Sequence, residues 1–147
     1  MGEVNEFQLL EYYLDAILTS DDPNEARRNL ALFEKQILVC ESLQIDFNKS
    51  WCDATVYVEK ARIEMNESGY TSKSIKDAIK LMNTAIDIYP DDVDYWYLRA
   101  TLHMAVRNYD EVIRDTSYVI ANSDDDDIDV ILQARKLRDE AELMMGI

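Results

Sequence analysis

The sequence predicts an all-α protein, and three observations support this prediction. First, apolar residues recur every three or four positions almost throughout the chain, which is the spacing of one helix face. Second, the 147 residues include only three glycines and two prolines, too few turn formers for a fold of many strands. Third, the breaks between the periodic segments are short, so neighbouring helices must run antiparallel. We therefore expect about seven helices in a single domain spanning residues 1–147.

The first helices are marked by their apolar stripes and capping residues. One stripe covers residues 7–18. Asp22 is placed to cap a second helix, with proline at its first position, that covers residues 23–43. A third helix follows, and either Asp46 or Asn48 can supply its cap. Residues 1–47 are thus predicted to form an N-terminal helix pair.

The remaining helices are separated by clear stop signals. Gly69 is placed to end the third helix, because glycine tolerates the left-handed backbone that follows a helix. Ser72 is expected to cap a fourth helix over residues 75–88, which Pro90 prevents from continuing. The last three helices are expected at about residues 93–106, 109–121 and 128–144.

Two segments of the chain repeat at a fixed distance. The run "SIKDAIKLMNTAIDIYPDD" at 74–92 aligns with "NYDEVIRDTSYVIANSDDD" at 108–126, with an offset of 34 residues throughout. Ile79 matches Ile113 and Ile86 matches Ile120 under this offset. A period of 34 residues built from two antiparallel helices is the spacing of a helical repeat.

The best unit resembles the tetratricopeptide repeat (TPR) family. Trp96 stands at the family's first aromatic position, Ala100 at its first small position, and "NYDEVI" resembles its turn into the second helix. His103 and Arg99 depart from the family's usual Tyr and Leu. The resemblance implies antiparallel helix pairs stacked as a short right-handed α-solenoid. Its expected parts are an atypical pair (1–47), a TPR-like unit with an extended turn (48–91), the best TPR unit (92–124) and a C-terminal capping helix (125–147).

The charge of the chain limits its partners. Thirty acids and fifteen bases give a formal net charge of −15, and the excess acids lie in residues 1–47 and 92–147. Such a chain repels phosphate backbones and anionic lipid surfaces, so we expect no direct binding to nucleic acid or membranes. The acidity favours a basic protein or peptide partner, or serves solubility alone.

No catalytic, cofactor or metal motif is recognised. The glycines are Gly2, Gly69 and Gly146, so no glycine-rich phosphate loop can form. The acidic run at 124–127 lacks the spacing of a calcium loop and is expected to cap the helix that follows it and to add solubility. Histidine occurs once, at His103, and is expected to pack structurally. We therefore expect no enzyme activity and no cofactor.

The two cysteines bear on the compartment. Cys40 and Cys52 are expected to be small buried hydrophobes in a reducing cytoplasm, since nothing in the sequence argues for an oxidising compartment. The N-terminal residues carry no secretory signal, and no apolar run approaches the length of a membrane span. The expected location is therefore cytoplasmic.

The TPR resemblance implies a concave face on the first helices of the units. The expected partner-binding residues are Tyr97, Leu98, Thr101, Met104, Ile131, Arg135 and Arg138. They would form an apolar groove with a basic edge, suited to a segment with hydrophobic anchors. Alternatively, the N-terminal helices fold over this surface and bury it.

Part of the chain is also similar to TPR co-chaperones that hold a terminal carboxylate with Asn, Lys and Arg. Leu98, Ile128 and Leu132 stand at the corresponding positions here, and an apolar side chain cannot pair a carboxylate. We therefore do not expect such a clamp.

The hypothesis that follows is a non-catalytic interaction scaffold or adaptor for a peptide segment or partner domain. A chaperone for a secreted or assembly-prone protein is an alternative of the same class. An enzyme with an unrecognised site is the alternative from a different class, and it would need a polar pocket with converging acids and His103. A homodimer that covers an open end of the array is also compatible with a short repeat protein.

Overall fold

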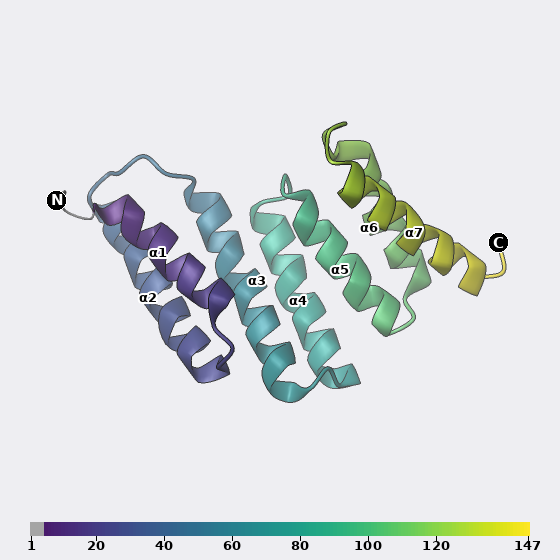
Figure 1. Ribbon diagram of the computed structural model, residues 1–147, viewed down its shortest axis with the longest axis horizontal. Coiled ribbons are helices and arrows are strands. Elements are labelled where there is room, and N and C mark those ends of the chain that lie inside the picture. Colours follow the sequence, from purple (N-terminus) through teal and green to yellow (C-terminus); the bar gives the residue numbers. More distant parts are fainter. Residues whose placement is uncertain (1–4) are drawn as a thin grey trace.

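The computed structural model describes residues 5–147 and confirms the all-α class. Seven helices follow one another along this part of the chain, and no strand occurs in it (Figure 1). The helices are α1 (Glu6–Thr19), α2 (Pro23–Ser42), α3 (Lys49–Ser68), α4 (Ser72–Ile88), α5 (Val93–Ala105), α6 (Tyr109–Asn122) and α7 (Ile128–Met144). Their bounds lie within a few residues of those that periodicity and capping predict.

Local chemistry explains most of the helix ends. The Asp22 carboxylate accepts a hydrogen bond from the backbone N–H of Asn24 at 3.0 Å, and Pro23 is the first residue of α2, as predicted. Asn48, rather than Asp46, caps α3 by accepting from the backbone N–H of Trp51 at 3.1 Å. These side chains satisfy backbone donors that have no partner within their own helices.

Two expectations about the link between α3 and α4 need correction. Thr71, not Ser72, caps α4, because its hydroxyl accepts from the backbone N–H of Ser74 at 3.2 Å. The extended turn expected in residues 48–91 is also wrong. Gly69, with φ of 74°, ends α3 in the left-handed conformation as predicted, and only residues 69–71 separate the two helices. The extra length of this unit lies in α3, which is 20 residues long.

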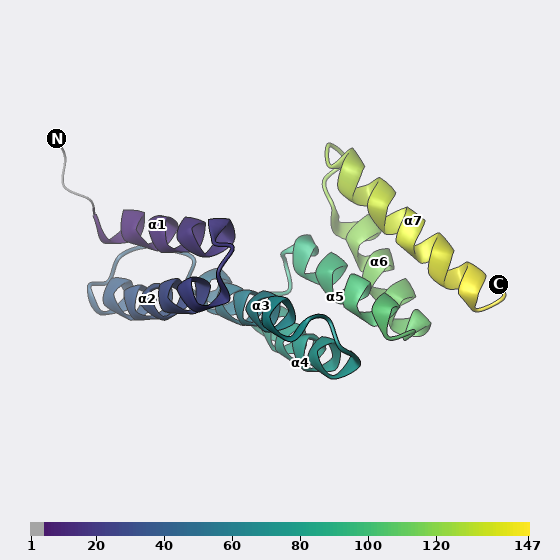
Figure 2. The same cartoon turned by 60° about the horizontal axis from the view of Figure 1, so that its bottom comes forward.

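The helices stack in chain order. Within the described residues α1 packs on α2, α3 on α4 and α5 on α6, while α2–α3, α4–α5 and α6–α7 contacts join these pairs. Figure 1 shows the array running from α1 at one end to α7 at the other. Figure 2 shows α1 standing over α2 and α7 standing over α6, both on the same side of the array. The architecture is therefore an all-α helical repeat.

Helix α3 is shared by two hydrophobic cores. One core joins α1, α2 and α3 around Leu10, Phe33 and Cys52. The other joins α3, α4 and α5 around Val58, Met82 and Leu102. Helix α3 contributes buried residues to both cores, so it is buried on two sides, as expected of a helix that packs between neighbours.

A buried ion pair fastens α5 to α6. Arg99 donates through Nε to Asp115 Oδ2 at 2.9 Å and through Nη2 to Oδ1 at 2.8 Å. Its third donor, Nη1, reaches Asn83 Oδ1 on α4 at 3.0 Å. The Asp115 side chain is 1% exposed and that of Arg99 15% exposed. Arg99, the departure from the usual Leu, therefore links three consecutive helices through one guanidinium group.

An aromatic pair fixes the turn before α5. Trp96 and Tyr118 stack with their ring centroids 3.7 Å apart. The Trp96 indole N–H donates to the carbonyl of Pro90 at 2.8 Å, and the Tyr118 hydroxyl donates to the same carbonyl at 3.0 Å. The guanidinium of Arg99 lies 4.9 Å from the centre of the Trp96 ring. The motif tryptophan thus belongs to the packing of the repeat.

We predict that Asp115→Ala lowers the free energy of unfolding by about 3 kcal/mol, because it leaves the largely buried Arg99 charge without its partner. Urea titration followed by circular dichroism measures this loss. The matched control is Glu111→Ala, which removes an exposed ion pair with Arg114 on the same helix and should cost less than about 1 kcal/mol. Equal losses in the two variants would show that the buried pair contributes no more to the free energy of unfolding than the exposed pair does.

Candidate functional site

The predicted groove residues of α5 are half-buried. Tyr97, Leu98, Thr101 and Met104 all fall in this class, between the fully buried core positions of the helix. Leu98 packs against the core shared by α3, α4 and α5. The Thr101 hydroxyl donates to the carbonyl of Leu98 at 2.6 Å within the same helix. Part of this predicted surface therefore serves packing inside the repeat.

The predicted residues of α7 lie on one side of the helix, within an arc of about 60° at 100° per residue, but they differ in exposure. Ile131 and Arg138 are half-buried, whereas Arg135 is exposed. Arg135 lies in a shallow depression on the outer side of α7 together with Leu132, Lys136 and Leu143. Helix α7 packs mainly on α6 and only slightly on α5. The seven predicted residues therefore differ in exposure, and their role in partner binding stays a prediction.

The N-terminal pair does not cover α5. Helices α1 and α2 lie at the opposite end of the array from α5, α6 and α7, and α2 joins the array through α3 (Figure 1). Of the two arrangements that the sequence left open, burial of the predicted groove by these helices is thus not the one observed. The pair instead extends the array and adds a surface of its own.

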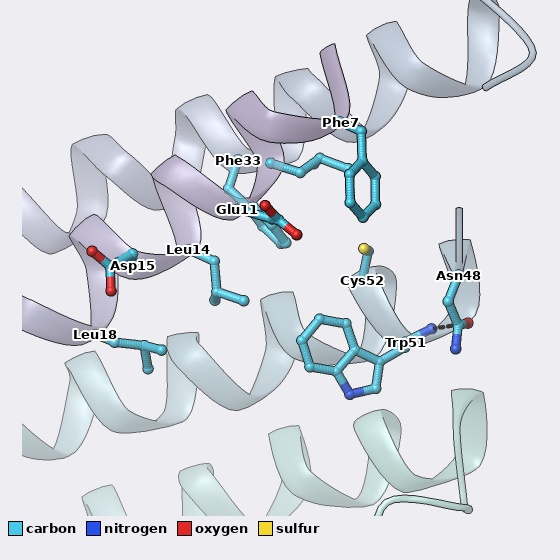
Figure 3. Close-up of a pocket in the computed structure, with 10 residues that line it drawn as sticks. Phe7, Glu11, Leu14, Asp15, Leu18, Phe33, Asn48, Trp51 and Cys52 are labelled. Atoms are coloured by element: carbon cyan, nitrogen blue, oxygen red, sulfur yellow. Dashed lines mark hydrogen bonds between the residues drawn. The ribbon is translucent and has the colours of Figure 1, made fainter. Parts of the chain in front are cut away.

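A cavity of about 420 Å³ lies between α1 and α3. Figure 3 shows α1 side chains on one side of it and Trp51 and Cys52 of α3 on the other. The lining is mostly apolar and consists of Phe7, Leu10, Glu11, Leu14, Asp15, Leu18, Phe33, Asn48, Trp51 and Cys52. Phe7 is 41% exposed and Leu18 55% exposed, so the cavity opens to solvent at its α1 edge.

The Trp51 side chain is held in place where it lines the cavity. Its indole N–H donates to Asp92 Oδ2 at 3.0 Å, and the other carboxylate oxygen of Asp92 caps α5 by accepting from the backbone N–H of Asp94 at 3.0 Å. One carboxylate therefore ties α3 to the start of α5. Because the indole N–H is already paired, the ring offers an apolar surface of fixed position to the cavity.

Two carboxylates stand at the edge of the cavity. Glu11 and Asp15 are both exposed, and neither forms an ion pair within residues 5–147. They are four residues apart on α1, where like charges destabilise a helix by a few tenths of a kcal/mol. A cationic group bound at this edge would remove that repulsion. The cavity therefore combines an apolar lining with an acidic rim.

This cavity was not predicted from the sequence, although the sequence contains a signal for it. Leu10 and Ile17, the buried residues of α1, lie on one line along the helix. Phe7, Leu14 and Leu18 lie to one side of that line at 100° per residue. This apolar arc is wider than packing on α2 alone requires. The width of this apolar arc on α1, in a segment without the repeat signature, indicates a second contact surface on the helix.

The cysteine thiols are unsuited to nucleophilic chemistry. Burial raises the pKa of Cys52 to about 11, with smaller contributions from Asp53 and Cys40. Burial also raises the pKa of Cys40. Both cysteines are buried and free, as predicted. Since the thiolate is the nucleophile, both groups are in their unreactive form near neutral pH.

His103 is packed inside the repeat, as predicted. Its side chain is buried on α5, and its Nδ1 lies 3.2 Å from the amide nitrogen of Asn108. Burial lowers the pKa of His103, while the nearby Asp115 and Glu111 oppose that effect. The imidazole is therefore neutral at physiological pH.

The acidic run before α7 forms no coordination site in the structure. Asp127 is the N-cap residue of α7, but its side chain makes no capping hydrogen bond, so the expected capping is wrong there and the contribution that remains is electrostatic. Across residues 5–147 no cluster of three or more His, Cys, Asp or Glu side chains is arranged to hold a metal ion. In the same part of the chain, none of the helices has the length and apolarity that crossing a membrane requires.

Comparison with known proteins gives one partial similarity. The Hsp70-Hsp90 organising protein of Plasmodium falciparum (isolate 3D7), which contains TPR units, is 36% identical to this chain over 53 residues. The match covers 36% of this chain and 9% of that protein. No family model matches the chain, and no solved structure matches it. The partial match and the seven stacked helices are together consistent with a TPR-like fold.

We predict that His103 makes the protein less stable as the pH falls. Because burial lowers its pKa in the folded state, the unfolded chain takes up a proton more readily, and the stability present above the ordinary value of 6.5 is lost below it. Between about pH 7.5 and 5.5, the free energy of unfolding of the wild type should fall more than that of His103→Gln. Urea titration at both pH values measures the difference, and parallel losses in both proteins would contradict the assignment.

Proposed function

We propose that this chain is a non-catalytic protein–protein interaction scaffold that binds a segment of a partner protein. The observation that carries the proposal is the open, mostly apolar cavity between α1 and α3. Cavities of this kind accept one large apolar side chain, while the surrounding helices guide the rest of the segment. The stacked array is a rigid support for such a surface.

The chemistry of the cavity indicates what the partner segment carries. The apolar side chains Phe7, Leu14 and Leu18 would contact a hydrophobic anchor such as Leu or Phe. Glu11 and Asp15 at the rim would pair with Lys or Arg one helical turn from that anchor. The net charge of −15 would in addition speed the approach of a basic partner.

The partial relative supports a role in protein interaction for this chain. That protein is named for organising Hsp70 and Hsp90, and its similarity to this chain extends over 53 residues. Leu98, Ile128 and Leu132 supply no donor for a terminal carboxylate, and Leu98 packs against the core. We therefore propose recognition through an internal apolar anchor, with the α5 residues Tyr97 and Met104 as a second contact area.

The absence of catalysis and a cytoplasmic setting are further parts of the proposal. Both thiols are protonated near neutral pH, and the buried His103 is hydrogen-bonded within its own repeat. These features support a structural role for the nucleophilic residues. Two buried, unpaired thiols are also compatible with a reducing compartment.

The test uses peptides selected from a random library displayed on phage, with the wild-type chain as bait. We expect enriched peptides to share a large apolar residue next to Lys or Arg. Fluorescence anisotropy should then show binding that Leu18→Glu weakens about tenfold or more, because a carboxylate would replace an apolar contact in the cavity. Added salt should weaken binding as well, since it screens the rim carboxylates.

The matched control is Tyr12→Glu. Tyr12 is an exposed aromatic residue of the same helix, 66% exposed and outside the cavity lining, so this variant should bind as the wild type does. Circular dichroism establishes that both variants keep their helix content. Equal binding by all three proteins would place the partner surface elsewhere, and a library without enriched peptides would count against the scaffold proposal.

A further inference from the structure

The outward face of α7 carries an unusual charge order. Ala134 and Ala141 are completely buried against the rest of the array. The opposite face holds two exposed leucines, Leu132 at 56% and Leu143 at 75% exposure. Between them lie two bases, Arg135 and Lys136, and then two acids, Asp139 and Glu140. These six residues line one shallow depression.

The six residues form a single stripe along the helix. At 100° per residue, Leu132, Lys136, Asp139 and Leu143 fall within an arc of about 60°. Arg135 lies about 40° beyond one edge of that arc and Glu140 about 40° beyond the other. The centre of the stripe is about 180° from Ala134 and Ala141. It is therefore the face of α7 turned furthest from α6.

The stripe is complementary to itself when a second copy runs antiparallel. A two-fold axis between residues 137 and 138 places Leu132 of one copy opposite Leu143 of the other. On one flank Lys136 then faces Glu140 of the second copy, and on the other flank Arg135 faces Asp139. The symmetry generates each contact twice, giving four opposite-charge pairs between two pairs of leucines. A parallel arrangement would instead bring like charges together.

Charge also explains why this face can approach another copy. The whole chain carries −15, which disfavours self-association over most of its surface. The stripe has two bases and two acids and is locally neutral. None of these four charged side chains forms an ion pair within residues 5–147. They are thus available for pairing between copies.

We propose that the outward face of α7 is a self-association surface, on which two copies of this chain pair their α7 helices antiparallel about a two-fold axis. Across the width of the stripe, Leu132 and Leu143 pair along its midline, and the two kinds of ion pair lie on either side of that line. This pairing gives a specific arrangement for the homodimer that the sequence left open. It also places Arg135 between copies instead of in a groove with α5.

The first experiment is sedimentation equilibrium over a wide range of protein concentration. We expect the wild type to dimerise. Arg135→Glu with Lys136→Glu makes the stripe entirely acidic, and Asp139→Lys with Glu140→Lys makes it entirely basic. Each double variant alone should associate about tenfold or more weakly, because like charges then face each other. An equal mixture of the two should associate again, which a pairing confined to one chain cannot produce.

The matched control for net charge is Lys73→Glu with Lys76→Glu, which changes the charge of exposed residues on α4 by the same amount. This variant should dimerise more strongly than the acidic-stripe variant, and closer to the level of the wild type. A wild type that remains monomeric throughout would overturn the proposal. So would a dimer that the acidic-stripe variant leaves intact.

The antiparallel register has its own test. In a background where Cys40 and Cys52 are replaced by Ser, one chain carries Leu132→Cys and another Leu143→Cys. Mild oxidation of the mixture should cross-link the two different chains, whereas each chain alone should cross-link poorly. Efficient cross-linking of the Leu132→Cys chain with itself would contradict the antiparallel pairing. Circular dichroism of both background chains checks that the helices are retained.

Discussion

The bidentate pair between Arg99 and Asp115 is the interaction on which the C-terminal half of the array depends. Three donors of one guanidinium bind side chains from α4 and α6 while the group itself belongs to α5. Apolar packing alone would allow neighbouring helices to slide along or rotate against one another. Directional hydrogen bonds with a buried carboxylate permit one register. The Trp96–Tyr118 stack and the Pro90 carbonyl rest on that register.

The N-terminal half is organised differently, and this difference creates the cavity. Helices α1 to α3 share an apolar core but have no buried ion pair like that of Arg99. Helix α1 packs on α2 through Leu10 and Ile17, whereas Phe7, Leu14 and Leu18 face α3 without filling the space between the two helices. Helix α3 is joined to α5 by the hydrogen bond between Trp51 and Asp92 and by one between the hydroxyls of Thr55 and Tyr95 at 2.8 Å. An apolar hollow therefore remains at this end of the array, where the repeat resemblance is weakest.

Helix positions followed from the sequence because they depend on local chemistry. Asp22, Asn48 and Gly69 act within one turn of their own position, and each does what its residue type predicts. Thr71 caps α4 in place of the predicted Ser72. Both residues carry a hydroxyl that can cap a helix, and the backbone conformation determines which of the two occupies the N-cap position. Open surfaces are harder to predict, because they depend on which residues neighbouring helices leave uncovered. Leu98 has the periodicity of a groove residue, yet it packs partly against the core shared by α3, α4 and α5.

The two tryptophans give the chain an internal pair of optical reporters. Trp51 borders the cavity between α1 and α3, whereas Trp96 is stacked on Tyr118 beside the α4–α5 turn. Most helix contacts join neighbours in the chain, and α3 is the element that the two hydrophobic cores share. Because the Trp51 indole N–H donates to Asp92 at the start of α5, emission from Trp51 alone reports the joint between the two halves, whereas emission from Trp96 alone reports the C-terminal half. Loosening of that joint and of the C-terminal half can therefore be followed separately in the two single-tryptophan variants without an attached dye.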